Sequence, residues 1–224
     1  MLKTAIILGA TGLTGGILLN NLIEDNSFEK IKLFSRKSVS IKSDKIEQYL
    51  IDVLQLEKYK NKFIADVVFC CVGTTAAKTK DIVKYKQIDY GIPVTAVKIA
   101  KENNIDTFVV ISSMGANASS TTFYSKTKGE MERDVLRQNI KNTYIVRPSL
   151  IGGHRNEFRI GERIGKGVMS LLNPMFLGSL KKYKMIHPEK IASCMQKLAK
   201  IELDQSIFSS DEIVEIANST KYNE

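Results

Sequence analysis

Short apolar runs alternate along this chain with segments whose apolar residues recur at helical spacing. The runs are rich in β-branched residues, as buried strands are, and Pro93 predicts a kink or a new start in the longest helical segment. Alternating strands and helices are typical of an α/β, doubly wound parallel sheet whose ligands bind at the carboxyl ends of the strands. The pattern predicts strands at residues 4–8, 31–34, 46–50, 67–71, 107–112, 143–146 and 207–208, and helices at residues 16–24, 55–62, 83–103, 124–138 and 211–217.

The segment ILGATGLTGG, residues 7–16, lies between the first predicted strand and the first predicted helix. Gly9, Gly12 and Gly15 recur every three residues, where missing Cβ atoms permit a tight turn and a close approach of the backbone. The amides at the start of the helix then point at a pyrophosphate, whose charge the helix dipole favours. The segment lacks the lysine of a Walker loop, and a secretory signal here would take the first strand from the sheet. We therefore predict a dinucleotide-binding turn, with a plain structural turn as the alternative.

The composition describes a globular protein of one sizeable domain: 224 residues, of which 43% are hydrophobic and 25% are charged. We expect residues 1–224 to form a single NAD(P)-binding domain, with a small substrate or lid region around residues 150–190. No apolar run approaches the ~20 residues of a membrane span, so we expect no membrane association. The three cysteines do not suit a disulfide framework and favour the reducing cytoplasm.

The formal net charge is +9, and residues 141–200 contain 12 Lys and Arg against three acids. Such a region suits a nucleic-acid backbone, an anionic cofactor or an anionic substrate, and a lysine-rich solvated surface explains part of the excess. The sequence has no zinc-ligand spacing, RNA-binding aromatic signature or basic zipper, so we do not expect a nucleic-acid partner. His154 and His187 are isolated from other ligand types, so we expect no metal site.

The second predicted strand ends in LFSRKS, where an NAD-selective site places a carboxylate for the ribose 2′-hydroxyl. Here Arg36 and Lys37 follow Ser35, and no acid is present. Two cations at this point can bind a 2′-phosphate, and arginine can do so through two hydrogen bonds. We therefore expect NADP(H) to be preferred over NAD(H). The alternative is that Arg36 is an ordinary surface residue.

Two further strand ends contribute to the expected cofactor site. Asp52 follows the third strand and can accept a hydrogen bond from the adenine amino group, with Val53 against the ring. Gly73 follows the fourth strand and lets the backbone approach the ribose. Neither segment is specific by itself, but both fall where the fold requires contacts with a ligand.

The segments VVISSMGA and YSKTK predict the reaction site. Tyr124 and Lys128 are four residues apart, so a helix places them on one face. A tyrosine can donate or accept a proton near neutrality when a nearby ammonium favours its phenolate. Ser113, at the end of the fifth strand, can hold a substrate carbonyl, and Lys128 can also bind the nicotinamide ribose. Chance alone predicts about one Tyr-x-x-x-Lys pair in this chain, so the prediction depends on the pair's position after a Ser-Ser strand end.

Together, GATGLTGG, ISSMGA, YSKTKGE and VRPSLIGGHRNEFRIGE resemble the atypical short-chain dehydrogenase/reductase superfamily, in particular its branch of Tat-interacting-protein-like NADPH-binding proteins. The resemblance runs from about Lys3 to about Pro188. It implies one Rossmann domain with strand order 3-2-1-4-5-6-7. The implied cofactor contacts are Thr11, Gly12, Leu13 and Thr14 at the phosphates, Arg36 and Lys37 at the 2′-phosphate, Val72 and Gly73 at the ribose, Tyr124 and Lys128 at the nicotinamide, and Ile151 and Arg159, with Pro148 at the site edge.

The sequence departs from the family in two ways. The catalytic asparagine of the classical enzymes has no clear counterpart, because the equivalent helix offers Asp89 and Tyr90. The chain is also shorter than nucleotide-sugar epimerases and dehydratases, whose additional lobe binds the sugar nucleotide. The resemblance implies an NADP(H)-dependent reductase that acts on a small carbonyl or enone. The alternative is an NADPH-binding regulatory protein with a protein partner and no significant turnover.

Three arginines, Arg155, Arg159 and Arg163, recur every four residues after the sixth strand. On a helix they would share one face and repel one another unless an anion faced them. Glu157 and Glu162 can neutralise part of this charge, which would make the segment a salt-bridged structural loop. The other hypothesis is a lid over the nicotinamide, in which Arg159 contacts the cofactor or an anionic substrate.

Overall fold

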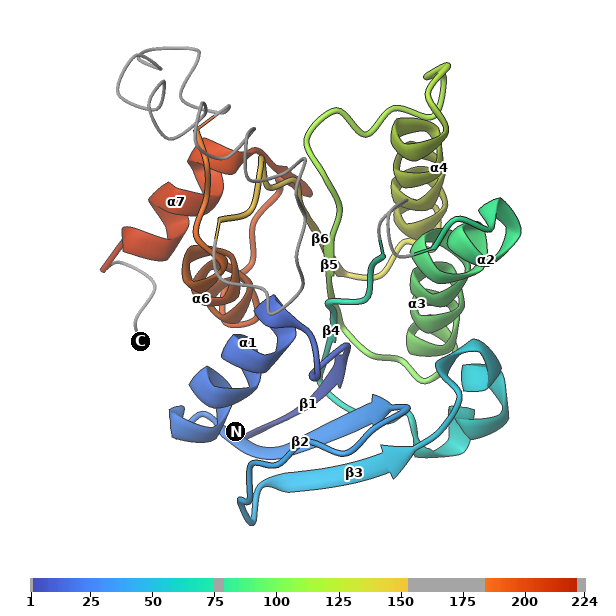
Figure 1. Cartoon of the computed structure of the whole chain (residues 1–224). Coiled ribbons are helices and arrows are strands. Elements are labelled where there is room, and N and C mark those ends of the chain that lie inside the picture. The colour runs from blue at the N-terminus through green and yellow to red at the C-terminus, as the bar shows by residue number, and fades with distance from the viewer. Residues whose placement is uncertain (1, 75–78, 153–183, 221–224) are drawn as a thin grey trace.

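The computed structural model describes residues 2–74, 79–152 and 184–220, and these form a seven-stranded sheet (Figure 1). Its order, β3-β2-β1-β4-β5-β6-β7, confirms the predicted α/β doubly wound topology. Each neighbouring pair of strands is parallel. The strands are β1 (Lys3–Leu8), β2 (Phe28–Ser35), β3 (Ile46–Leu50), β4 (Val67–Cys70), β5 (Thr107–Ile111), β6 (Asn142–Val146) and β7 (Ile207–Phe208).

Helices cover both faces of the sheet (Figure 1). One hydrophobic cluster joins the sheet to α1, α6 and α7, and the other joins it to η1, α3 and α4. Because successive side chains of a strand point to opposite faces, Ile7 belongs to the first cluster and Ile6 and Leu8 to the second. The helices are α1 (Leu13–Glu24), the 3-10 helix η1 (Val53–Lys62), α2 (Ile82–Lys86), the π-helix η2 (Gln87–Gly91), α3 (Ile92–Glu102), α4 (Phe123–Leu136), α6 (Pro188–Leu198) and α7 (Ser210–Asn218).

Two helical segments differ from the prediction. The helix expected over residues 83–103 is divided into α2, η2 and α3, and Pro93 lies in the first turn of α3, as its fixed φ favours. Helix α6 was not predicted, because it follows a glycine- and arginine-rich stretch without a clear pattern. It buries Ile191, Met195 and Leu198, whose spacing of four and three residues is typical of a helix packed on a core.

Most of the substrate or lid region expected around residues 150–190 lies outside the described residues. Arg155, Arg159 and Arg163 all belong to that part, so both hypotheses for them stay predictions. Among the helices that the structure describes, none is long and apolar enough to span a membrane.

Candidate functional site

The glycine-rich turn (residues 9–15) connects β1 to α1. Gly9 has φ +89°, and a Cβ there would lie 2.8 Å from the carbonyl oxygen of Cys71. The Gly12 amide donates a 2.9 Å hydrogen bond to the Gly9 carbonyl, which closes the turn. A Cβ on Gly15 would lie only 2.2 Å from the same Gly9 oxygen. Gly9 and Gly15 are therefore required by the packing of the turn against the end of β4.

The amino end of α1 is suited to an anionic ligand. Gly12 is its N-cap, and within the described part of the chain no side-chain cap hydrogen bond is formed there. Thr11 and Gly12 are exposed, Leu13 is half-buried and Thr14 is buried. Free amides at a helix amino terminus attract anions, so this end of α1 fits a pyrophosphate as the sequence predicts.

Arg36 and Lys37 directly follow β2 and are both exposed. The Ser35 hydroxyl donates a 2.7 Å hydrogen bond to the Lys37 carbonyl and so fixes the backbone between them. Both cations thus lie at the carboxyl end of the strand next to β1, where the fold places an adenine ribose.

Asp52 has a structural role that the sequence analysis did not consider. It is the N-cap of η1, and its Oδ1 accepts a 3.1 Å hydrogen bond from the Leu54 amide. Val53 packs against the hydrophobic cluster under η1. The predicted contacts of Asp52 and Val53 with adenine stay predictions, since capping of η1 accounts for the acid by itself.

Lys128 lies beside the end of β4, next to the predicted ribose residues Val72 and Gly73. A Cβ on Gly73 would lie 3.8 Å from the Lys128 Nζ and 3.5 Å from the Asp89 Oδ1. The Nζ and Oδ1 atoms form a 2.9 Å ion pair, and the other Asp89 oxygen accepts a 2.7 Å hydrogen bond from the Thr74 amide. Sequence reasoning named Asp89 only as a departure and missed this pair.

The groups around Lys128 keep its side chain protonated. Burial by itself lowers the pKa of this ammonium, but the Asp89 carboxylate and Tyr124 more than offset it, so the pKa lies above its ordinary value. The side chain of Lys128 is buried, and Tyr124, one helical turn earlier, is 42% exposed. Helix α4 therefore presents an accessible phenol with a fixed cation beneath it.

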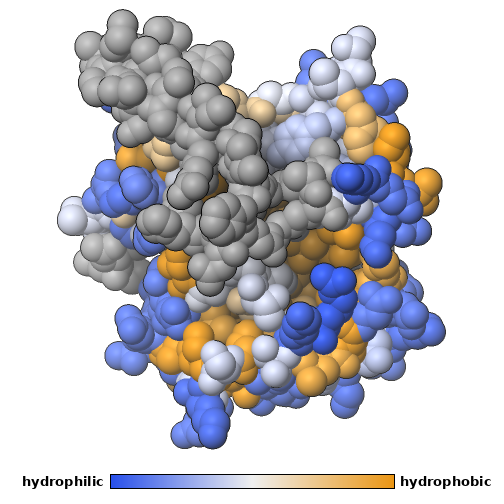
Figure 2. All heavy atoms as spheres, in the orientation of Figure 1, coloured by the Kyte–Doolittle hydropathy of each residue, from blue (hydrophilic) through white to orange (hydrophobic). Residues whose placement is uncertain are grey.

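Aromatic side chains surround that phenol. The ring of Tyr85 on α2 lies 5.4 Å from the ring of Phe123 and 6.4 Å from that of Tyr124, both as edge contacts. Phe123 is exposed, as are Ile82 and Val83 on α2. Figure 2 shows apolar atoms among hydrophilic ones on the side of α2 and α4. The surroundings of Tyr124 thus offer an apolar surface to a substrate.

Ser112 and Ser113 follow β5. Their hydroxyl oxygens are buried and have no hydrogen-bond partner among the described residues. A buried hydroxyl without a partner is costly, so these two atoms are suited to a ligand's polar groups. The next residue, Met114, donates a 3.0 Å backbone hydrogen bond to the Pro148 carbonyl, which ties this loop to the segment after β6.

The loop that follows Ser113 is held tightly against α4. The Asn117 amide donates a 3.0 Å hydrogen bond to the Ser125 carbonyl, next to Tyr124 in the chain. A Cβ on Gly129 would lie 2.1 Å from the Ala118 nitrogen, so only glycine permits this contact. Gly129 was missed by sequence reasoning, although it directly follows Lys128 in YSKTKGE.

The segment after β6 supplies the remaining predicted contacts. Pro148 is buried, and Ile151 forms an isolated parallel bridge with Ile186. Arg147, before the proline, forms a two-point ion pair with Glu132, which joins the end of β6 to α4. Arg159 lies outside the described residues, so its cofactor contact stays a prediction.

The cysteines serve packing. The structure describes Cys70 and Cys194 as buried and Cys71 as half-buried, all free thiols. Burial raises the pKa of the Cys70 and Cys194 thiols to about 12, which keeps both protonated at neutral pH. Cys71 lies under the glycine-rich turn, where it limits the space at Gly15.

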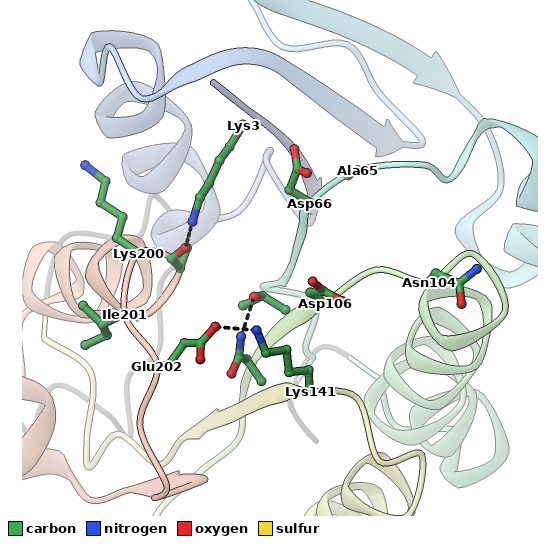
Figure 3. A pocket seen from close by; sticks show the side chains of 12 residues that line it. Lys3, Ala65, Asp66, Asn104, Asp106, Lys141, Lys200, Ile201 and Glu202 are labelled. Carbon is green, nitrogen blue, oxygen red and sulfur yellow. Dashed lines mark hydrogen bonds and ion pairs between the residues drawn. The ribbon is translucent and has the colours of Figure 1, made fainter. Parts of the chain in front are cut away.

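A polar hollow of about 250 Å³ lies at the opposite edge of the sheet, near the amino ends of β1, β4, β5 and β6 (Figure 3). Two of its lysines bind within the protein: Lys3 donates to the Ala199 carbonyl at 2.6 Å, and Lys141 forms a 2.6 Å ion pair with Glu202. Since ligands of open α/β sheets bind beyond the carboxyl ends of the strands, this hollow is not the nucleotide site.

Comparison with known proteins decides the family. A family model described as NAD(P)H-binding matches residues 9–162, which include the glycine-rich turn, Ser113, Tyr124 and Lys128. The chain belongs to this NAD(P)H-binding family.

This NAD(P)H-binding protein has relatives among fungal and mammalian proteins. It is 32% identical to "Protein FMP52, mitochondrial" of Candida albicans over 96% of this chain and 99% of the relative, and 37% identical to the protein of that name from Debaryomyces hansenii over 69% of each. It is 31% identical to "Protein HTATIP2" of Rattus norvegicus over 73% of this chain and 69% of the relative. The last match confirms the Tat-interacting-protein-like relationship.

The names of the fungal relatives correct one expectation. They are mitochondrial by name, so the cytoplasmic location expected from the cysteines is contradicted. Three free thiols argue against a disulfide framework, but they do not distinguish one reducing compartment from another.

Solved structures of low sequence identity share the fold of this NAD(P)H-binding protein. The enzyme WbmH of Bordetella bronchiseptica, in complex with NAD+, matches with a TM-score of 0.70 and 13% identity over 97% of this chain and 80% of that one. The UDP-glucose 4-epimerase of Thermotoga maritima matches with a TM-score of 0.67 and 13% identity over 99% and 84%. The NAD(P)H-binding family model and the match to HTATIP2, together with this shared fold, support the resemblance to atypical short-chain dehydrogenases/reductases.

Proposed function

We propose that the protein is an NADP(H)-dependent reductase of a small carbonyl or enone. The observation that carries this proposal is the pairing on α4 of the exposed Tyr124 with the buried cation of Lys128, which lies beside Gly73 at the end of β4. Ser113 follows the neighbouring strand β5, and its hydroxyl has no hydrogen-bond partner among the described residues, which supports a role for it in the same site. Family membership supports binding of the nicotinamide cofactor, and this cluster supports chemistry beside it.

Each group has a role suited to its environment. A nicotinamide cofactor bound beside these residues would supply or accept the hydride. The Ser113 hydroxyl donates a hydrogen bond to the substrate oxygen and orients the carbonyl. Tyr124 completes the reaction by moving a proton between its phenol and that oxygen. Lys128 holds the ribose hydroxyls, and its ammonium favours the phenolate form of Tyr124 during the transfer. The apolar surface around Phe123 favours a substrate with an apolar portion.

Preference for NADP(H) is part of the proposal. Arg36 and Lys37 are exposed at the end of β2, and residues 36–43, which directly follow that strand, contain no acid. A 2′-phosphate would gain charge-assisted hydrogen bonds there, whereas the 2′-hydroxyl of NAD(H) would find no carboxylate.

We also propose that residues 1–224 form one nucleotide-binding domain.

We further propose a mitochondrial location. It is supported by the names of the fungal relatives, one of which matches 96% of this chain. Cell fractionation of the tagged full chain tests it, with the tag expected in the mitochondrial fraction. Recovery in the cytosolic fraction would contradict it.

Oxidation of NADPH across a panel of aldehydes, ketones and enones tests the reductase. We expect steady turnover with at least one substrate, and we expect Tyr124→Phe to lower it by roughly a hundredfold while NADPH affinity stays within a few fold. Tyr59→Phe is the control, because it removes the same hydroxyl from a tyrosine on η1, outside the proposed reaction site. Tight NADPH binding without turnover by any compound would instead favour a regulatory role, in which the cofactor changes a surface presented to a protein partner.

A further inference from the structure

The ion pair between Lys128 and Asp89 lies inside the proposed site and away from solvent. Their side chains are 5% and 1% exposed, and the Nζ to Oδ1 distance is 2.9 Å. The second oxygen of Asp89 is held by the Thr74 amide at 2.7 Å. Both partners are thus fixed where β4 ends, within reach of the expected cofactor ribose.

Two helical segments, α2 with η2 and the helix α4, face each other at this point. Tyr85 and Asp89 are four residues apart across α2 and η2, and Tyr124 and Lys128 are four residues apart on α4. The two tyrosine rings lie 6.4 Å apart, and the two charges form the ion pair one turn later. The π-helix η2 contains Asp89, and such short π-segments are frequent at functional sites.

A buried lysine needs a counter-charge to stay protonated, because desolvation disfavours the ammonium. The titratable groups that act on Lys128 from the described elements are Asp89 on η2, Tyr124 on α4 and Cys70 on β4. Cys70 remains a thiol, since burial raises its pKa to about 12. Tyr85, on α2, is a buried phenol whose pKa burial and the Asp89 charge both raise. Asp89 is therefore the carboxylate in contact with the ammonium.

We propose that Asp89 is a positioning residue: it is the counter-ion that keeps Lys128 charged and in place for the cofactor. The inference rests on the proposed function, in which Lys128 holds the nicotinamide ribose. In an Asp89→Asn variant the amide keeps the size of the side chain and an oxygen for the Thr74 amide. Without the carboxylate, Lys128 loses its proton in a pH range where the native residue stays charged.

The test is NADPH affinity, measured by calorimetry from about pH 7 to about pH 9.5, relative to native protein at each pH. The Asp89→Asn/Lys128→Met double variant gives the affinity of a site without either charge. We expect Asp89→Asn to bind within a few fold of native at the lowest pH and to approach the double variant at the highest, a loss of about tenfold or more. Asp81→Asn is the matched control, because Asp81 is an exposed N-cap of α2 and asparagine caps equally well.

Affinity of Asp89→Asn that follows native protein at every pH would overturn the proposal. If that variant does not fold, nitrogen NMR of native protein decides, with the Lys128 signal identified by its loss in the double variant. We expect Lys128 to lose its proton at a higher pH than the exposed lysines of the same protein, and loss at a lower pH than theirs would overturn the proposal. If the double variant binds NADPH as native protein does, the proposed contact between Lys128 and the ribose is wrong. The NMR titration of Lys128 then still tests whether Asp89 is its counter-ion.

Discussion

Substitution of Gly15 by alanine tests the glycine-rich turn on which the cofactor site depends. The added Cβ would lie 2.2 Å from the Gly9 oxygen and 3.2 Å from the Cβ of Cys71, whereas ordinary contacts begin at 3.4 Å. The Gly9 carbonyl would therefore have to move by about 1 Å, and it is the group that accepts the Gly12 amide. Both the stability of the turn and the direction of the phosphate-binding amides would change.

The magnitude follows from two opposing effects. Alanine in place of glycine inside a helix gains about 0.5–1 kcal/mol, while overpacking against a fixed backbone costs about 1–3 kcal/mol or more. Because the displaced atom is a backbone carbonyl rather than a flexible side chain, we expect a net loss of about 2 kcal/mol. For a chain of 224 residues this lowers Tm by about 4–8 °C. NADPH affinity should fall about tenfold or more, since the phosphate contacts are displaced.

Differential scanning fluorimetry measures the first effect and calorimetry with NADPH the second. Gly16→Ala is the matched control, because Gly16 lies in the same helix and its Cβ would be 3.3 Å from the Ala10 oxygen, where a small shift suffices. We expect that variant to keep Tm within about 2 °C of native, with unchanged NADPH affinity. Equal stability and equal affinity of the two variants would refute the steric argument at Gly15.

Three further predictions concern cofactor choice, the reaction site and stability. Arg36→Glu should remove most of a preference for NADPH over NADH that we expect to be about 2 kcal/mol in native protein, measured by calorimetry with both cofactors. Gly129→Ala should lower turnover about tenfold or more and lower Tm, because its Cβ would lie 2.1 Å from the Ala118 nitrogen and push the Ser113 loop from α4. Asp25→Asn should cost about 1–2 kcal/mol in urea unfolding near neutral pH, and this loss should shrink steadily as the pH falls below about 4. Burial raises the pKa of Asp25, but hydrogen bonds led by that of Lys200 hold it well below its ordinary value, so its contribution is complete above about pH 5 and declines on acidification until the folded carboxylate is protonated.

Each of these predictions has an outcome that would contradict it. Lys42→Glu, the same change in the loop after Arg36, should leave the cofactor preference within about twofold, and an equal effect of the two variants would indicate general electrostatics. Native turnover and Tm in Gly129→Ala would show that the loop does not depend on close packing there. A loss in Asp25→Asn that does not shrink between neutral pH and about pH 2 would exclude the carboxylate as its cause.

Local sequence patterns predicted the strands of the sheet well. A strand of a parallel sheet that is buried on both faces is a continuous apolar run in the sequence, as residues 67–71 are. The glycine-rich turn was also predictable, since Gly9 and Gly15 are required by local geometry that their spacing expresses. Helix α6 was not predicted, although Ile191, Met195 and Leu198 recur at helical spacing, because the glycine- and arginine-rich stretch before it shows no clear pattern. The π-helix at Asp89 has no sequence signature and divides a segment that was predicted as one helix.

The site was predicted less completely, for a related reason. Tyr124 and Lys128 share a helix, so their proximity follows from a spacing of four residues. The contact of Lys128 with Asp89 joins two helices 39 positions apart in the chain, and no local pattern expresses it. Gly129 is similar, because the backbone that excludes its Cβ belongs to the loop before α4.

The central claim is that this protein binds NADP(H) with the nicotinamide beside Tyr124 and Lys128. A crystal structure of the NADPH complex measures this directly. We expect the pyrophosphate at the amino end of α1, the 2′-phosphate in contact with Arg36 or Lys37, and the nicotinamide ribose within hydrogen-bond distance of the Lys128 Nζ. A dinucleotide bound elsewhere, or a nicotinamide directed away from Tyr124, would contradict the account.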